Sequence, residues 1–201
     1  MLLTRAVELI PHSVELWLAL ARLGNSQHAK AVLNKARKAI PTSHDIWIAA
    51  AQLLEQEALD DAAEGKEPKP STADIIDKTI EMGVRELRKH GVLFTREQWL
   101  QEAEKCDEGG KPRTCEAIVK ATVVMEVEEE DRYSTWMGDV EAMEGKGRIA
   151  TARAVLAYAL KVFPNRVKLW ERAAYLEQSH GTGYYFILFI LCLAFNVDTS
   201  V

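Results

Sequence analysis

The chain contains little of what breaks or cross-links a protein. Among 201 residues there are only 11 glycines, 6 prolines and 3 cysteines. Because glycine and proline interrupt regular structure, their scarcity favours long helices over many short strands. The cysteines, Cys106, Cys115 and Cys192, form no Cys-x-x-Cys pair and are odd in number. This usage is typical of reduced thiols in an intracellular protein and not of a disulfide framework.

An excess of positive charge is also missing. The chain has 25 Lys and Arg against 30 Asp and Glu, a net charge of −5. Nucleic-acid binding draws its affinity from phosphate neutralisation, so the chain as a whole lacks that attraction. Two basic groups are interpreted either as a solvated outer face or as a local RNA contact. They are Lys30, Lys35, Arg37 and Lys38, and Arg85, Arg88 and Lys89.

No apolar run is long enough to cross a membrane. The longest covers residues 184–195, whereas a spanning helix needs about 20 residues. The N-terminal apolar segment is interrupted by Arg5 and Glu8 and is not a signal peptide. We therefore predict no membrane partner. Residues 184–195 have three possible interpretations: a membrane-associated helix, a final packing helix or a sequence artefact.

Signatures of chemistry are absent as well. The five histidines, His12, His28, His44, His90 and His180, show no His-Glu-x-x-His spacing. Neither a glycine-rich phosphate loop after a strand nor a Gly-x-Ser-x-Gly motif occurs. Cys106 and Cys115 have no predicted base beside them, which favours buried thiols over nucleophiles. We predict no enzyme activity, no catalytic residue, no cofactor, no metal and no small-molecule substrate.

What the chain does contain is an internal repeat. Residues 29–47 and 152–170 align without a gap. Both hold an Ala-Lys/Arg-Ala-Val-Leu stretch, then an alanine, a proline and a tryptophan. The shared positions are Ala36 and Ala159, Pro41 and Pro164, and Trp47 and Trp170. The head of the chain repeats the ending as Pro11-x5-Trp17, and degenerate copies precede Trp99 and Trp136.

The repeat predicts pairs of antiparallel helices, a first or A helix and a second or B helix. Proline after a B helix ends it, and Ser13 or Ser43 then serves as N-cap of the next A helix. Thr95 to Gln98 matches a capping box. The recurring tryptophans, together with the small Ala36 and Ala159, are interpreted as core packing positions and not as an aromatic ligand site.

These positions lay out an all-α fold, a right-handed α-solenoid of antiparallel helix pairs. We expect B helices over residues 2–10, 25–39, 72–89, 112–126 and 148–163. The expected A helices span residues 13–23, 43–57, 95–106, 131–144 and 166–179. Residues 57–71 are predicted to be an inserted loop or an extended helix end. No segment shows the alternation of a strand.

The chain resembles the half-a-TPR (HAT) repeat family of RNA-processing proteins over residues 1–182. The resemblance is carried by the Pro-x5-Trp units and by four stretches: residues 11–17, 95–99, 128–137 and 173–182. It implies a non-catalytic protein–protein scaffold in pre-mRNA splicing, in the nucleus, bridging components of the spliceosomal tri-snRNP. The implied partners are tri-snRNP proteins, with at most a weak or indirect RNA contact. A generic TPR-like peptide-binding module is the alternative.

We therefore expect a solenoid over residues 1–182: a half unit, four helix pairs and a final A helix. Residues 183–201 are expected to be a hydrophobic tail outside the family pattern. Solenoids end in polar capping repeats, and neither end of this chain has one. This favours a fragment, or a gene-model product whose tail is read from outside the normal frame or exon.

Overall fold

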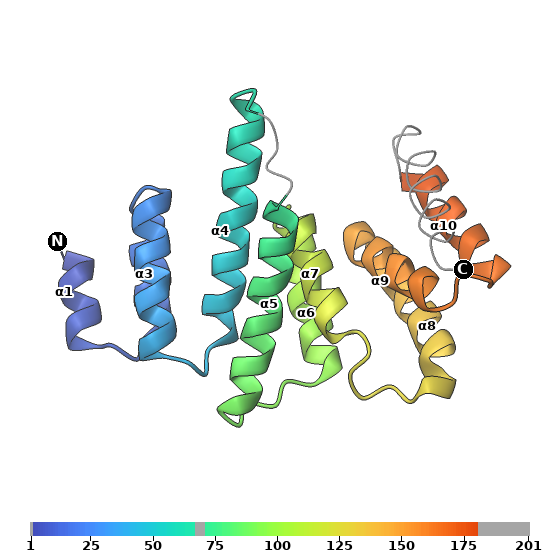
Figure 1. The fold of residues 1–201 in the computed structure, drawn as a ribbon, viewed down its shortest axis with the longest axis horizontal. Coiled ribbons are helices and arrows are strands. Elements are labelled where there is room, and N and C mark those ends of the chain that lie inside the picture. Colours follow the sequence, from blue (N-terminus) through green and yellow to red (C-terminus); the bar gives the residue numbers. More distant parts are fainter. Residues whose placement is uncertain (1, 67–70, 181–201) are drawn as a thin grey trace.

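The computed structural model describes residues 2–66 and 71–180, and every regular element in those ranges is a helix (Figure 1). The elements are α1 (Leu2–Leu9), α2 (Val14–Arg22), α3 (Ser26–Ala39), α4 (His44–Ala63), α5 (Thr72–Lys89), α6 (Arg96–Glu108), α7 (Pro112–Thr122), the short η1 (Glu129–Asp131), α8 (Arg132–Gly145), α9 (Ile149–Val162) and α10 (Val167–His180). The all-α prediction is confirmed.

The helices are arranged as stacked pairs. Helix α2 packs on α3, α4 on α5, α6 on α7 and α8 on α9, so each A helix lies against the B helix that follows it. Along the stack, the B helices α5, α7 and α9 pack on one another. Figure 1 shows the resulting elongated row of helices, consistent with a TPR- or HAT-like solenoid.

Local capping explains several helix starts. The Ser13 hydroxyl accepts a hydrogen bond from the N–H of Leu16 at 3.4 Å. Thr95 and Gln98 form both hydrogen bonds of the predicted capping box. Ser43 is the N-cap residue of α4, but its hydroxyl makes no cap bond and instead donates to Asp45 at 3.4 Å. Side-chain caps satisfy backbone N–H groups that a helix leaves free at its start.

Two elements differ from the expected boundaries. Helix α4 runs to Ala63, so residues 57–63 are an extended helix end and not a loop. It stops where Gly65 adopts a φ of 74°, the left-handed conformation that ends many helices. Helix α7 stops at Thr122, although the apolar pattern predicts it to continue to residue 126. The Val123 carbonyl instead accepts bonds from Arg96 and Trp136, and Glu126 has a φ of 58°.

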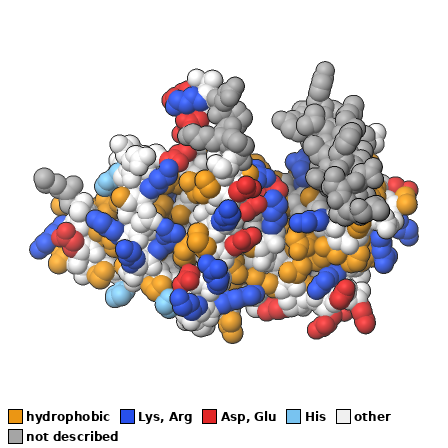
Figure 2. Space-filling view, viewed as in Figure 1, with side chains coloured by type: hydrophobic (Ala, Val, Ile, Leu, Met, Phe, Trp, Pro, Cys, Tyr) orange, Lys and Arg blue, Asp and Glu red, His pale blue; other side chains and the backbone are white. Residues whose placement is uncertain are grey.

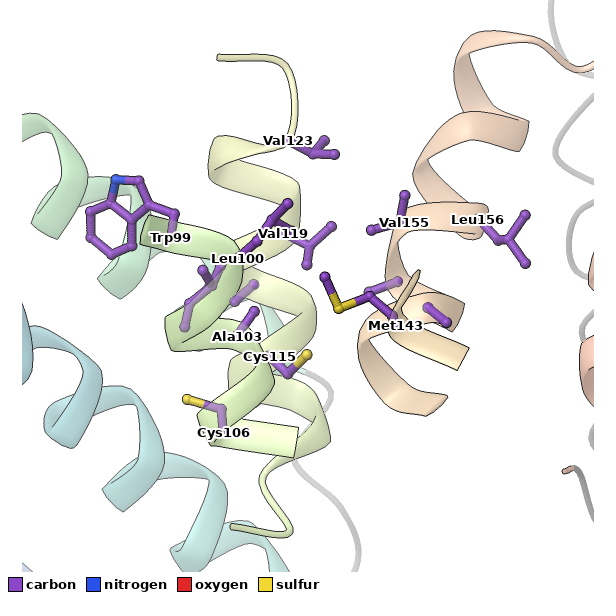
Figure 3. Packing of buried hydrophobic residues seen from close by; sticks show 14 of the residues in the cluster. Trp99, Leu100, Ala103, Cys106, Cys115, Val119, Val123, Met143, Val155 and Leu156 are labelled. Atoms are coloured by element: carbon purple, nitrogen blue, oxygen red, sulfur yellow. The ribbon is translucent and has the colours of Figure 1, made fainter. Parts of the chain in front are cut away.

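The hydrophobic core divides at α4. One cluster runs from Val7 to Ile46 and includes Trp17 and Leu33. The other begins at Ile48 and extends to Leu176. Figure 3 shows part of the second cluster, where Val119 and Val123 of one helix pair face Met143 and Val155 of the next. Since α4 contributes to both clusters, it is the element that joins the N-terminal and C-terminal parts of the stack.

Two carboxylates tie one pair to the next. Glu55 of α4 is only 3% exposed and accepts hydrogen bonds from the backbone N–H groups of Arg113 and Thr114 and from the Thr114 hydroxyl, at 2.7–2.9 Å. Asp107 of α6 does the same for the N–H and hydroxyl of Thr151, at 2.9 and 3.1 Å. Each acid therefore caps the B helix of the following pair, where helix N-termini favour negative charge.

The expected tail over residues 183–201 lies outside the described residues, as do residues 67–70 of the expected insertion. Among the helices of residues 2–66 and 71–180, none is both long and apolar enough to span a bilayer.

Candidate protein-binding groove

The five tryptophans belong to the A helices α2, α4, α6, α8 and α10. Trp17, Trp47, Trp99 and Trp136 are buried, with exposed fractions of 8%, 9%, 3% and 1%. Trp170 is partly buried and packs against the C-terminal core cluster. Ala36 and Ala159 are buried at 0% and 2%, where a larger side chain would separate neighbouring helices. We propose that these positions act through packing and do not contact a ligand.

The prolines of the repeat supply a carbonyl group as well as a helix end. The indole N–H of Trp17 donates to the Pro11 carbonyl oxygen at 2.8 Å, and that of Trp170 to the Pro164 carbonyl at 2.7 Å. The indole N–H of Trp136 instead donates to the Val123 carbonyl oxygen at 3.1 Å. The buried indole N–H of Trp47 has no acceptor among the described residues, and the Arg37 guanidinium lies 4.6 Å from the ring centroid.

A groove of about 590 Å³ opens beside these core positions, where the two core clusters meet. It is formed by the A helices α2, α4 and α6, with α3 closing one side. Its lining comprises Leu18, Ala21, Arg22, Ala29, Leu33, Asp45, Ile48, Ala49, Gln52, Leu53, Gln56, Glu102, Lys105, Cys106 and Lys111. The floor is apolar and the rim is polar, a composition typical of protein recognition sites.

Charges of both signs mark the rim. The Lys105 ammonium donates to Glu102 at 2.7 Å, and the Lys111 ammonium donates to the amide oxygen of Gln56. The Glu102 carboxylate raises the pKa of Lys105 above its ordinary value. Arg22 and Asp45 add one further charge of each sign. A partner with an apolar face and a few polar side chains would match this arrangement better than a strongly charged one.

At one edge of the groove, His44 lies close to two carboxylates. Its Nε2 atom is 3.4 Å from Asp45 and 3.6 Å from Glu102. The imidazole ring is held against Phe94, with 4.3 Å between ring centroids. These three polar residues could hold a metal ion by their spacing. However, Lys105 already supplies positive charge at Glu102, and we assign no metal here.

The two described cysteines are buried thiols. Cys106 and Cys115 are 1% and 0% exposed. Burial raises the pKa of Cys106 to about 11 and that of Cys115 to about 12, because the charged thiolate would lose its hydration. A thiol with so high a pKa is a poor nucleophile near neutral pH. Cys192 lies outside the described residues.

Sequence reasoning located the tryptophans but not the groove. Leu18, Ala49 and Leu53 belong to the apolar pattern of their helices and carry no local sign that they face an opening. Likewise, His44 and Glu102 are far apart in the chain, and only the packing of α4 beside α6 brings them together. The sequence feature that could have revealed the groove is the set of apolar A-helix residues that do not share a helix face with the tryptophan.

Comparison with known proteins agrees with this architecture. Residues 14–53, which span α2, α3 and the first half of α4, match the tetratricopeptide repeat. The groove therefore lies largely within the matched segment.

Similarity to individual proteins covers about half of the chain. It is 46% identical to pre-mRNA-processing factor 6 of Homo sapiens over 101 residues, 50% of this chain and 11% of the relative. Identity is 44% over 107 residues with pre-mRNA-splicing factor prp1 of Schizosaccharomyces pombe, 53% of this chain and 12% of the relative. Protein STABILIZED1 of Arabidopsis thaliana is 46% identical over 89 residues, 44% of this chain and 9% of that protein.

The chain thus spans about a tenth of the length of these curated relatives. Its helical pairs, its tetratricopeptide-repeat match and its sequence all agree. The chain is a helical-repeat protein that is similar, over half of its length, to pre-mRNA-processing and pre-mRNA-splicing factors.

Proposed function

We propose that the chain is a non-catalytic protein–protein scaffold that works in pre-mRNA splicing, in the nucleus. The observation that carries this proposal is a groove across three A helices in a chain 46% identical, over half its length, to a pre-mRNA-processing factor. A stack of helix pairs presents an extended surface on which several partners can bind at once. Within splicing, we assign the chain the role of bridging components of the tri-snRNP.

A generic peptide-binding module outside splicing is the second candidate. The tetratricopeptide-repeat match over residues 14–53 favours it, because that match includes most of the groove. Both candidates use the same surface, so the identity of the captured partners separates them.

Affinity capture from nuclear extract tests the proposal. The tagged chain should enrich tri-snRNP proteins, and nuclease treatment should not release them, because the contact is between proteins. Recovery of chaperones, or of RNA alone, would contradict the splicing assignment.

A matched pair of variants tests whether the groove is the binding surface. Ala49→Glu places a long charged side chain on the groove floor, whereas Ala62→Glu makes the same change at the exposed end of the same helix. Glutamate is a good helix former, so both variants should keep the fold. We expect Ala49→Glu to lose most of the captured proteins and Ala62→Glu to retain them. Equal retention by both variants would exclude the groove.

A further inference from the structure

Helix α3 carries an unbalanced positive charge. It contains Lys30, Lys35, Arg37 and Lys38 and no Asp or Glu. The next helix, α4, is the opposite, with acidic residues and no Lys or Arg. The acidic residues of α4 are Asp45, Glu55, Glu57, Asp60 and Asp61. Although the net charge of the chain is −5, basic and acidic side chains are therefore separated onto the neighbouring helices α3 and α4.

Contacts within the chain neutralise only part of α3. Lys30 pairs with Glu57 of α4 at 2.6 Å. Arg37 is half-buried over the Trp47 ring and donates to Asn34. Lys35 and Lys38 are exposed, and in the part of the chain that the structure describes neither forms an ion pair. Two of the four cations are thus available to an external anion.

The C-terminal half of α5 adds to this surface. Arg85 and Arg88 are exposed and, among residues 2–66 and 71–180, have no ion-pair partner. Figure 2 shows Lys and Arg side chains gathered over α3 and the lower part of α5, on one face of the molecule. Of the acidic residues of α5, Asp74 and Asp77 lie in its N-terminal half; Glu81 and Glu86 lie in its C-terminal half, where Glu86 pairs with Lys89 at 3.5 Å.

The other exposed residues of α3 indicate the kind of anion. They are Gln27, His28, Ala31 and Asn34, and none of the large exposed apolar side chains of the described residues belongs to α3. Protein interfaces need an apolar or aromatic centre, which this helix does not offer. Cations mixed with amides are instead the groups that contact phosphate and sugar oxygens of nucleic acids.

We propose that the face formed by α3 and the C-terminal half of α5 binds the phosphate backbone of an RNA strand, chiefly through Lys35, Lys38, Arg85 and Arg88. The site is separate from the groove, because none of these four residues lines it. Binding is sequence-independent and weak, since the rest of the chain is acidic. It would give a protein scaffold a second, electrostatic contact with a ribonucleoprotein partner.

Fluorescence anisotropy with a labelled oligouridylate of about 20 nucleotides tests the proposal on the full chain. Each phosphate contact on a single strand contributes about 0.7 to the slope of log affinity against log salt, so four cations predict a slope of about −3 between about 50 and 200 mM salt. Lys35→Gln/Lys38→Gln should weaken binding about tenfold at low salt and make the slope shallower by about 1.4.

The matched control is Lys161→Gln/Lys168→Gln, which removes the same charge from two exposed lysines of α9 and α10. It should bind like the parent chain. An equal loss in both variants would mean unspecific attraction and would overturn the proposal, as would no binding by the parent. Competition by a polyglutamate peptide as strong as by unlabelled RNA of equal charge would assign the face to acidic proteins instead.

Discussion

The indole nitrogen of Trp17 donates a hydrogen bond to the carbonyl oxygen of Pro11 at 2.8 Å, a contact that the fixed spacing of proline and tryptophan allows. Proline ends the preceding helix, and its carbonyl, turned away from any helical partner, accepts the indole proton. Trp170 and Pro164 repeat the contact at 2.7 Å. In these two copies the motif therefore fastens the start of the A helix to the turn before it. The Trp47 indole N–H makes no such bond among the described residues.

This contact predicts unequal effects of the same substitution at two tryptophans. Trp17 and Trp47 are almost equally buried, at 8% and 9% exposure, but among the residues that the structure describes only Trp17 has an acceptor for its indole N–H. Trp17→Phe should therefore cost about 1 kcal/mol more in the free energy of unfolding than Trp47→Phe, the usual net value of one hydrogen bond. Urea denaturation followed by circular dichroism measures the difference. Equal losses would show that the contact contributes nothing.

A pair of glycines should respond to alanine with opposite signs. A Cβ at Gly83 of α5 would lie 2.8 Å from Cγ of Trp47, whereas one at Gly138 of α8 would meet nothing within 4 Å. Gly83→Ala should destabilise the chain by about 1–3 kcal/mol through overpacking. Gly138→Ala should stabilise it by up to about 1 kcal/mol, because alanine favours helix. Thermal unfolding of both variants checks the two signs. Stabilisation by both substitutions would contradict the close contact between Gly83 and the Trp47 ring.

Removing a carboxylate that joins two repeats should be costly. Glu55→Ala leaves the part-buried N–H group of Arg113 and the buried N–H group of Thr114 without their acceptor. We expect a loss of about 2–3 kcal/mol in the free energy of unfolding, the range for hydrogen bonds to a buried charged group. Glu64→Ala is the control, because the Glu64 side chain is 65% exposed and its ion pair contributes little. Chemical denaturation measures the free energy of unfolding of both variants. A difference between them smaller than the experimental error would contradict the capping role.

The buried thiols should be unreactive in the folded chain. Because the pKa values of Cys106 and Cys115 are raised to about 11 and about 12, both remain protonated at pH 8. In a Cys192→Ser background, we expect almost no alkylation by iodoacetamide at that pH until a denaturant is added. Mass spectrometry counts the modified residues. Rapid labelling of both thiols without denaturant would show that the α6–α7 core is open.

The same shifts fix the direction of a pH effect. A thiol whose folded pKa lies above its ordinary value of 9.0 contributes stability below that pH. That contribution is lost as the pH rises through the interval between 9.0 and the raised values, because the unfolded thiols ionise first. Substituting serine for both cysteines should flatten the decline of stability over this range, measured by denaturation at each pH.

Sequence alone determined the features that depend on near neighbours. The start of α6 at Arg96 follows from the capping box of Thr95 and Gln98, which is complete within a few residues. The end of α3 at Ala39 follows from Pro41, which restricts the backbone before it. The all-helical class follows from the same kind of local information, repeated along the chain.

Tertiary structure decided whatever depends on residues from different repeats. Helix α7 ends early because the Val123 carbonyl is taken by Arg96 of α6 and Trp136 of α8, which no local pattern reveals. The apolar residues Leu18 and Leu53 line an opening only because α2 and α4 pack beside each other with space between them. Helix periodicity places a side chain on a face, but the position of neighbouring helices decides whether that face is filled or left open to a partner.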